Sequence, residues 1–157
     1  MLDKVLLHQF ITPYIYFAFI LWLPFKINRS LLMILSFILG YTVDAFQNNP
    51  GFHAAACVLV AYLRPFIINL FIPQEGAETN YDEPSIKSFG GFMPYFMYAV
   101  VLIFIHNAWL FLLEAWQFAN PLYFFVKTVL STLLSIFLYI VIEMVFYRKQ
   151  KFKTNTI

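Results

Sequence analysis

One stretch of this sequence combines ionisable side chains with a background that is otherwise soluble in lipid. Residues 40–66 read GYTVDAFQNNPGFHAAACVLVAYLRPF and contain Asp44, His53 and Arg64. A carboxylate at this position can bind a proton or a ligand, and an arginine can extend towards phosphates. Because ionisable groups are expensive at membrane depth, each of the three needs a partner, a route to water or a function.

The spacing of these residues predicts which of them can meet. If the chain turns at residues 47–50, Asp44 and His53 each lie about 5 Å below the turn on neighbouring helices. Arg64 lies about 21 Å down the second of these helices, which is too deep for contact with Asp44. The sequence therefore predicts that Asp44 faces His53 across a tight hairpin.

Each of these residues has a structural and a functional interpretation. Asp44 either caps nearby backbone or reaches interfacial water, or else it binds a proton or a ligand; its shallow depth favours the structural role. A lone histidine lacks the companions of a metal site, which favours a structural role for His53. Arg64 either extends to phosphates at the cytoplasmic surface or contacts a partner, and Pro65 is expected to kink the helix.

Small residues around the turn favour close packing of the two helices. Gly40 and Asp44 are four residues apart on the first helix, and the alanines at 54–56 remove bulk from the second. Pro50 and Gly51 suit the start of a helix, where a missing N–H donor is not needed. This stretch therefore predicts a pinned helical hairpin.

A second group of polar residues lies further along the chain. His106 and Glu114 are eight residues apart, so they share a helix face that points either to another subunit or to the bundle interior. Nearby hydroxyl groups offer partners for this face, namely Ser131, Thr132 and Ser135. Lys127 is expected to extend to the outer interface, and Glu143 to lie solvated or paired at the inner one.

Five apolar stretches are long enough to carry these groups across a membrane, since a span needs about 20 mostly apolar residues. They cover approximately residues 5–25, 31–46, 52–72, 92–113 and 121–146. The chain is 62% hydrophobic and 11% charged, whereas a soluble domain has about 25% charged residues. We therefore expect an all-α integral membrane protein, a polytopic bundle of about five transmembrane helices in a single domain over residues 1–157.

Composition and motifs also exclude several function classes. The net charge of +2 is too small to indicate a nucleic-acid partner, and the one cysteine, Cys57, excludes an internal disulfide or a multi-cysteine metal site. The sequence has no catalytic triad pattern, no H-E-x-x-H and no glycine-rich phosphate loop. We therefore expect no enzymatic activity, no catalytic residues, no cofactor and no metal.

Basic residues in the short connections predict the orientation in the membrane. Lys26 and Arg29 separate the first two spans, and four more basic residues follow the last span. Since Lys and Arg accumulate on the cytoplasmic side, the N-terminus is expected outside and the C-terminus inside. Residues 73–91 then form an irregular acidic cytoplasmic loop, and residues 147–157 a basic cytoplasmic tail.

Three stretches together resemble a known family. TPYIYFAFILWLPF, the stretch quoted first and IHNAWLFLLEAWQF are similar to the rod shape-determining protein MreD family, in the form found in Bacteroidota. The similarity spans nearly the whole chain. The residues that match the family by position are Asp44, Phe46, Gly51, His53, Arg64 and Pro65, and the resemblance transfers no catalytic role to them.

The resemblance implies a scaffold of the cell-wall elongation machinery in the bacterial inner membrane. Its partners would be MreC and, indirectly, MreB, RodA and a penicillin-binding transpeptidase, besides the lipid bilayer. The implied fold has six helices, like the vitamin-binding subunits of energy-coupling-factor transporters. Family members begin with another helix before the segment at Thr12, so the first helix is expected to be truncated here.

The implied fold also keeps a second hypothesis open. The chain would then be the substrate-binding subunit of a small-molecule transporter of the vitamin type. This alternative predicts a polar cavity on the outer side, lined by Asp44, His53 and His106.

Overall fold

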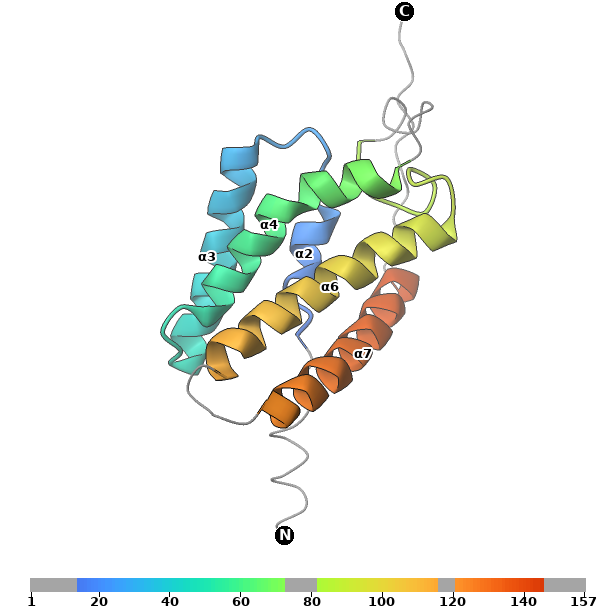
Figure 1. Ribbon diagram of the computed structural model, residues 1–157. Coiled ribbons are helices and arrows are strands. Elements are labelled where there is room, and N and C mark those ends of the chain that lie inside the picture. The colour runs from blue at the N-terminus through green and yellow to red at the C-terminus, as the bar shows by residue number, and fades with distance from the viewer. Residues whose placement is uncertain (1–13, 73–81, 116–120, 146–157) are drawn as a thin grey trace, which may run out of the picture.

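The computed structural model describes residues 14–72, 82–115 and 121–145, and these form helices joined by turns and loops. Four helices are long and apolar enough to cross a membrane: α3 (Arg29–Gln47), α4 (Phe52–Phe71), α6 (Phe92–Ala115) and α7 (Pro121–Val145) (Figure 1). The described residues also contain a short helix, α2 (Ala18–Trp22). The protein is therefore an all-helical, multi-pass membrane protein, which confirms the predicted fold class.

The long helices pack in chain order, α3 against α4, α4 against α6 and α6 against α7. The last turns of α3 and α6 lie at the same end of the bundle as the first turns of α4 and α7 (Figure 1). We call this the hairpin end, because it holds the turn at residues 48–51 between α3 and α4. The opposite end, with residues 23–28 and 82–91, is the loop end.

The first expected span is not a continuous helix in its described part. Residues 5–13 lie outside the described residues, and residues 14–25 contain only the five-residue α2. Residues 14–17 precede α2 without forming a helix, and α2 ends at Trp22 because Leu23 precedes Pro24 and is extended (φ −60°, ψ 148°). Non-helical backbone at membrane depth is tolerated only where protein surrounds it.

Protein does surround α2. Phe17, Ile20 and Leu21 are at most 1% exposed. The ring of Phe17 stacks on His106 of α6 at 4.3 Å, and the Trp22 indole donates a hydrogen bond to Glu143 of α7 (3.1 Å). The short helix α2 therefore lies at the centre of the core, between the long helices. The sequence alone predicts a span here that is as long as theirs.

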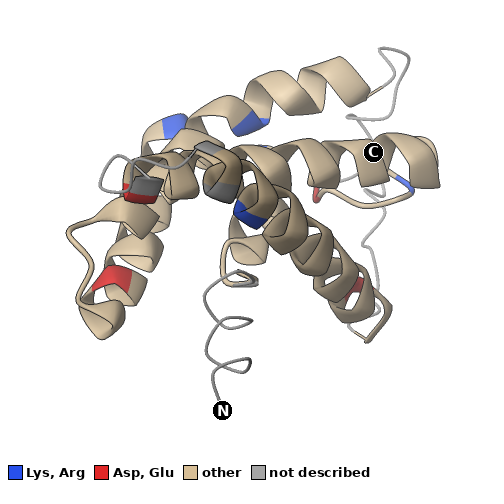
Figure 2. Cartoon of the chain, turned by 60° about the horizontal axis from the view of Figure 1, so that its bottom comes forward, with Lys and Arg blue, Asp and Glu red and all other residues tan. Residues whose placement is uncertain are grey.

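The outer surface of the long helices is apolar and aromatic. Charged side chains are few along the helices, which are almost entirely uncharged in Figure 2. On α3, for example, large apolar side chains point outwards, among them Leu31, Ile34, Phe37, Ile38 and Tyr41. Such a surface suits contact with lipid or with another membrane segment.

The end of the loop before α6 is part of the fold. Phe89 is fully buried against Phe25 and Tyr98, and Ser85 and Ser88 bond to each other within a turn. Residues 82–91 are irregular, as predicted. The rest of the expected acidic loop, residues 73–81, and the expected basic tail lie outside the described residues.

Candidate functional site

Asp44 caps α4 from the neighbouring helix. Its two carboxylate oxygens accept hydrogen bonds from the backbone N–H groups of His53 (3.0 Å) and Ala54 (2.8 Å) in the first turn of α4. The N-cap position is Gly51, which has no side chain that could accept them. A negative charge at a helix N-terminus is also stabilised by the helix dipole. The buried carboxylate on α3 thus supplies the cap that α4 lacks.

His53 lies beside Asp44, as the spacing predicted. The imidazole is fully buried, and its Nε2 lies 3.0 Å from Oε1 of Gln47. Its Nδ1 is 3.8 Å from the Asp44 carboxylate, which is longer than a hydrogen bond. The two residues are therefore joined through the main-chain N–H of His53, and the ring packs flat against Tyr16 (centroids 5.8 Å apart, 7° between planes).

Gly40 permits this close approach. A Cβ atom added at Gly40 would lie 2.5 Å from Cα of Ala54 and 2.6 Å from the carbonyl oxygen of His53. Both atoms belong to the backbone of α4, so they cannot move aside as a flexible side chain would. The absence of a side chain at position 40 therefore sets the distance between α3 and α4, and with it the reach of Asp44.

Arg64 bonds to the C-terminal end of α2. The guanidinium donates to the carbonyl oxygen of Leu23 and, through Nε, to the hydroxyl oxygen of Tyr98 (3.2 Å). The Tyr98 hydroxyl in turn donates to the carbonyl oxygen of Leu21 (3.0 Å). The last carbonyl groups of a helix lack partners within it, and a cation there also complements the helix dipole. Arg64 and Tyr98 together therefore cap the broken helix.

The sequence did not predict this arrangement. Arg64 is 2% exposed, and its head group bonds within the bundle instead of extending along its own helix. The helix itself continues past Pro65, and the second half of α4 runs at an angle to the first in Figure 1.

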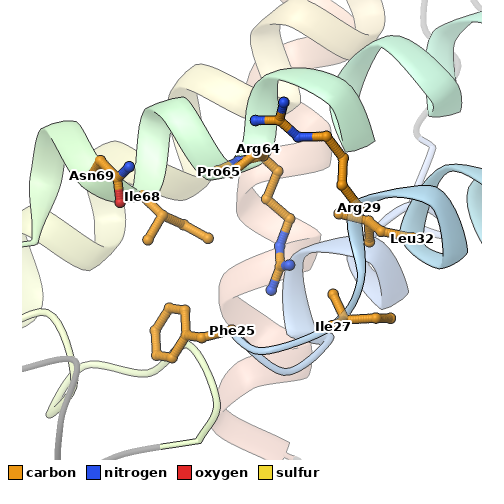
Figure 3. Close-up of a pocket in the computed structure, with 8 residues that line it drawn as sticks. All are labelled: Phe25, Ile27, Arg29, Leu32, Arg64, Pro65, Ile68 and Asn69. Atoms are coloured by element: carbon orange, nitrogen blue, oxygen red, sulfur yellow. The ribbon is translucent and has the colours of Figure 1, made fainter.

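A pocket opens beside Arg64 at the loop end. It lies between the start of α3 and the second half of α4, has a volume of about 110 Å³ and is lined by both Arg64 and Arg29. Figure 3 shows the Arg64 head group directed towards Phe25 and Ile27, and the Arg29 head group directed away from it. The Arg29 guanidinium lies over the rings of Phe66 and Tyr62, 5.1 and 5.8 Å from their centroids.

His106 is the centre of a buried polar network in the hairpin half of the bundle. Its Nε2 lies 3.0 Å from the hydroxyl of Tyr16, and its Nδ1 lies 3.4 Å from Oδ1 of Asn107. The Asn107 amide donates to the hydroxyl of Thr132 on α7 (3.2 Å). The polar side chain of His106 thus faces the bundle interior, one of the two orientations that the sequence left open.

Glu114 lies apart from His106 and pairs with Lys127. The ammonium of Lys127 is 2.5 Å from the Glu114 carboxylate, and it also lies over the ring of Phe111. This pair joins the last turn of α6 to the first turns of α7, in place of the expected extension of Lys127 to the interface. Phe46, by contrast, is 90% exposed near the hairpin end.

The sequence did not indicate which residues hold α2 and the segment before it in place. Tyr98 and Tyr16 are two of ten tyrosines, and their hydroxyl groups become informative only when a broken helix lies beside them. One signal was present in the sequence. An arginine deep in a span requires acceptors, and Leu-Pro at positions 23 and 24 frees main-chain carbonyl groups at a comparable depth.

We compared the chain with protein-family models, with curated proteins and with solved structures, and none of them matches it. The function of the protein is therefore inferred from its residues and their geometry.

Proposed function

We propose that this protein is a non-enzymatic membrane scaffold of the bacterial cell-wall elongation complex. It would regulate cell shape and peptidoglycan synthesis by docking MreC and, indirectly, MreB, RodA and the transpeptidase. Residues 40–66 support the proposal through their resemblance to the MreD family. The protein would lie in the cytoplasmic membrane with its C-terminus inside, an orientation favoured by Lys26, Arg29 and the four basic residues that follow the last span.

The observation that carries this proposal is how the family-matched residues divide between the inside and the outside of the bundle. Four of them hold the bundle or its turn together: Asp44, Gly51, His53 and Arg64. Phe46 is different, because an aromatic side chain that is 90% exposed contributes little to the stability of its own chain. Exposed aromatic residues are frequent anchors in protein–protein interfaces, so Phe46 is our candidate contact for a partner.

The buried polar groups favour a scaffold over a substrate-binding subunit. The transporter hypothesis needs Asp44, His53 and His106 to line a cavity and to bind a ligand. In the structure, both oxygens of Asp44 accept bonds from the main chain, and His106 bonds to Tyr16 and Asn107. Asp44 and His106 are therefore already satisfied by the protein itself, and Nδ1 of the buried His53 is the atom that lacks a hydrogen-bond partner among the described residues.

An affinity pull-down of the full-length protein from mild detergent tests the proposal, with co-purifying chains identified by mass spectrometry. We expect MreC together with RodA or the transpeptidase. Recovery of a transporter ATPase and its coupling subunit instead would contradict the scaffold function. It would make the surroundings of Asp44 and His53 the place to search for a ligand.

A further inference from the structure

The pocket at the loop end is lined by two arginines and, among the described residues, by no carboxylate. No ion pair joins Arg29 or Arg64 to a carboxylate within 4.0 Å among the described residues. A guanidinium carries five N–H donors, and described acceptors account for only two of those on Arg64. Arginine with unused donors is suited to bind planar or tetrahedral oxyanions.

The start of α3 adds to this positive potential. The pocket is lined by Ile27, Arg29 and Leu32, which flank or form the first turn of the helix. The side chain of Asn28 already caps the N–H of Ser30, and the helix dipole at this N-terminus favours an anion. The amide of Asn69 lies on the opposite wall, on α4, and offers a further donor.

The surroundings of Arg29 indicate the source of the anion. Its guanidinium lies over Tyr62 and Phe66, which are 47% and 50% exposed on the outer face of α4. Arg29 is the first residue of the membrane-spanning helix α3, and basic residues beside aromatic rings at such a helix end are typical of the headgroup level of a bilayer. At this level the phosphate of a lipid is present at high local concentration, and anionic lipids attract basic residues.

We propose that this pocket binds the phosphate group of an anionic phospholipid. Arg64 is held in place by Leu23 and Tyr98 and forms the fixed side of the site. Arg29 forms the other side, and its head group turns towards the pocket by rotation about its side-chain bonds when the phosphate enters. The lipid would thereby join α3, α4 and the capped end of α2.

Native mass spectrometry of the full-length protein in detergent tests this inference. The first bound molecule of phosphatidylglycerol is titrated for the wild type and for Arg29→Gln, with phosphatidylcholine as the lipid without net charge. Lys87→Gln is the matched control, because Lys87 is exposed at the same end but does not line the pocket. Arg64 is left unchanged because it also caps α2.

We expect the wild type to prefer phosphatidylglycerol and Arg29→Gln to weaken that binding about fivefold, the contribution of one basic residue near an anionic lipid. Lys87→Gln should weaken it less than twofold. Equal losses in the two variants would show only diffuse surface attraction and would overturn the proposal.

In a parallel arm, inorganic phosphate alone should not raise the thermal midpoint of the protein as phosphatidylglycerol does. An equal rise would identify a free phosphate as the ligand and would also overturn it.

Discussion

The carboxylate of Asp44 and the guanidinium of Arg64 both bond to main-chain atoms of another helix. Asp44 binds the N–H groups that begin α4, and Arg64 binds a carbonyl group that ends α2. Helix ends leave main-chain groups without partners, and within a bilayer water is not there to supply them. In each case the charge of the side chain is opposite in sign to the partial charge of the helix dipole at that end. Asp44 and Arg64, whose residue types suggest a functional site in the sequence, therefore cap the ends of neighbouring helices.

The cap on α4 gives the first prediction at the residue scale. Asp44→Ala should lower the stability of the protein in detergent by about 3 kcal/mol, because two N–H groups lose a charged acceptor in a buried site. Asp44→Asn keeps one acceptor oxygen and should give an intermediate value. The thermal midpoint measures both. Thr42→Ala on the exposed side of the same helix is the control, and a decrease no larger than its own would contradict the capping role.

The cap on α2 gives the second prediction. Tyr98→Phe removes only the hydroxyl that joins Arg64 to Leu21, and it should cost about 1–3 kcal/mol, because buried polar groups lose their partner. Tyr41→Phe makes the same chemical change on an exposed face of α3 and should be nearly neutral. Unfolding midpoints that fall equally, or not at all, would exclude the hydroxyl as a structural link.

At the scale of elements, the pair α3–α4 depends on the missing side chain of Gly40. Alanine is the better helix former by about 1 kcal/mol, so propensity alone predicts that Gly40→Ala stabilises the protein. The structure predicts the opposite, because the new Cβ would lie 2.5 Å from the backbone of Ala54. We expect a lower thermal midpoint and reduced protein level in membranes. A midpoint that is unchanged or raised would show that the helices are free to separate.

Elements also show what the sequence can and cannot predict. The four long helices and the pinned hairpin follow from runs of apolar residues and from the small residues around 40–56, so they were predictable. The short helix α2 was not, because its apolar run is as long as a span, and its bonds to Tyr98 on α6 and Glu143 on α7 cannot be read from the sequence. The pairing of Glu114 with Lys127 escaped prediction because they lie on different helices, in a register that the sequence leaves undetermined.

At the scale of the whole molecule, the interior and the surface have different tasks. Polar groups of the interior bond to each other and to the main chain of α2, and this leaves the outer face apolar and aromatic. The proposed scaffold function requires such a division, because the fold must persist while the surface exchanges lipid for a partner helix. Phe46 lies on that surface and matches the resembled family, so a variant at this position would separate the proposed docking from folding.

The measurement that tests the account most directly is the ratio of co-purified MreC to bait for wild type and for Phe46→Ala, taken from the same membranes. We predict that Phe46→Ala leaves the bait level and its thermal midpoint unchanged, because the side chain is exposed, and that the ratio falls severalfold, as for other aromatic interface anchors. Tyr41→Ala, also exposed on α3, is the matched control. A ratio that stays at the wild-type value, or a wild-type bait that recovers no MreC, would contradict the account.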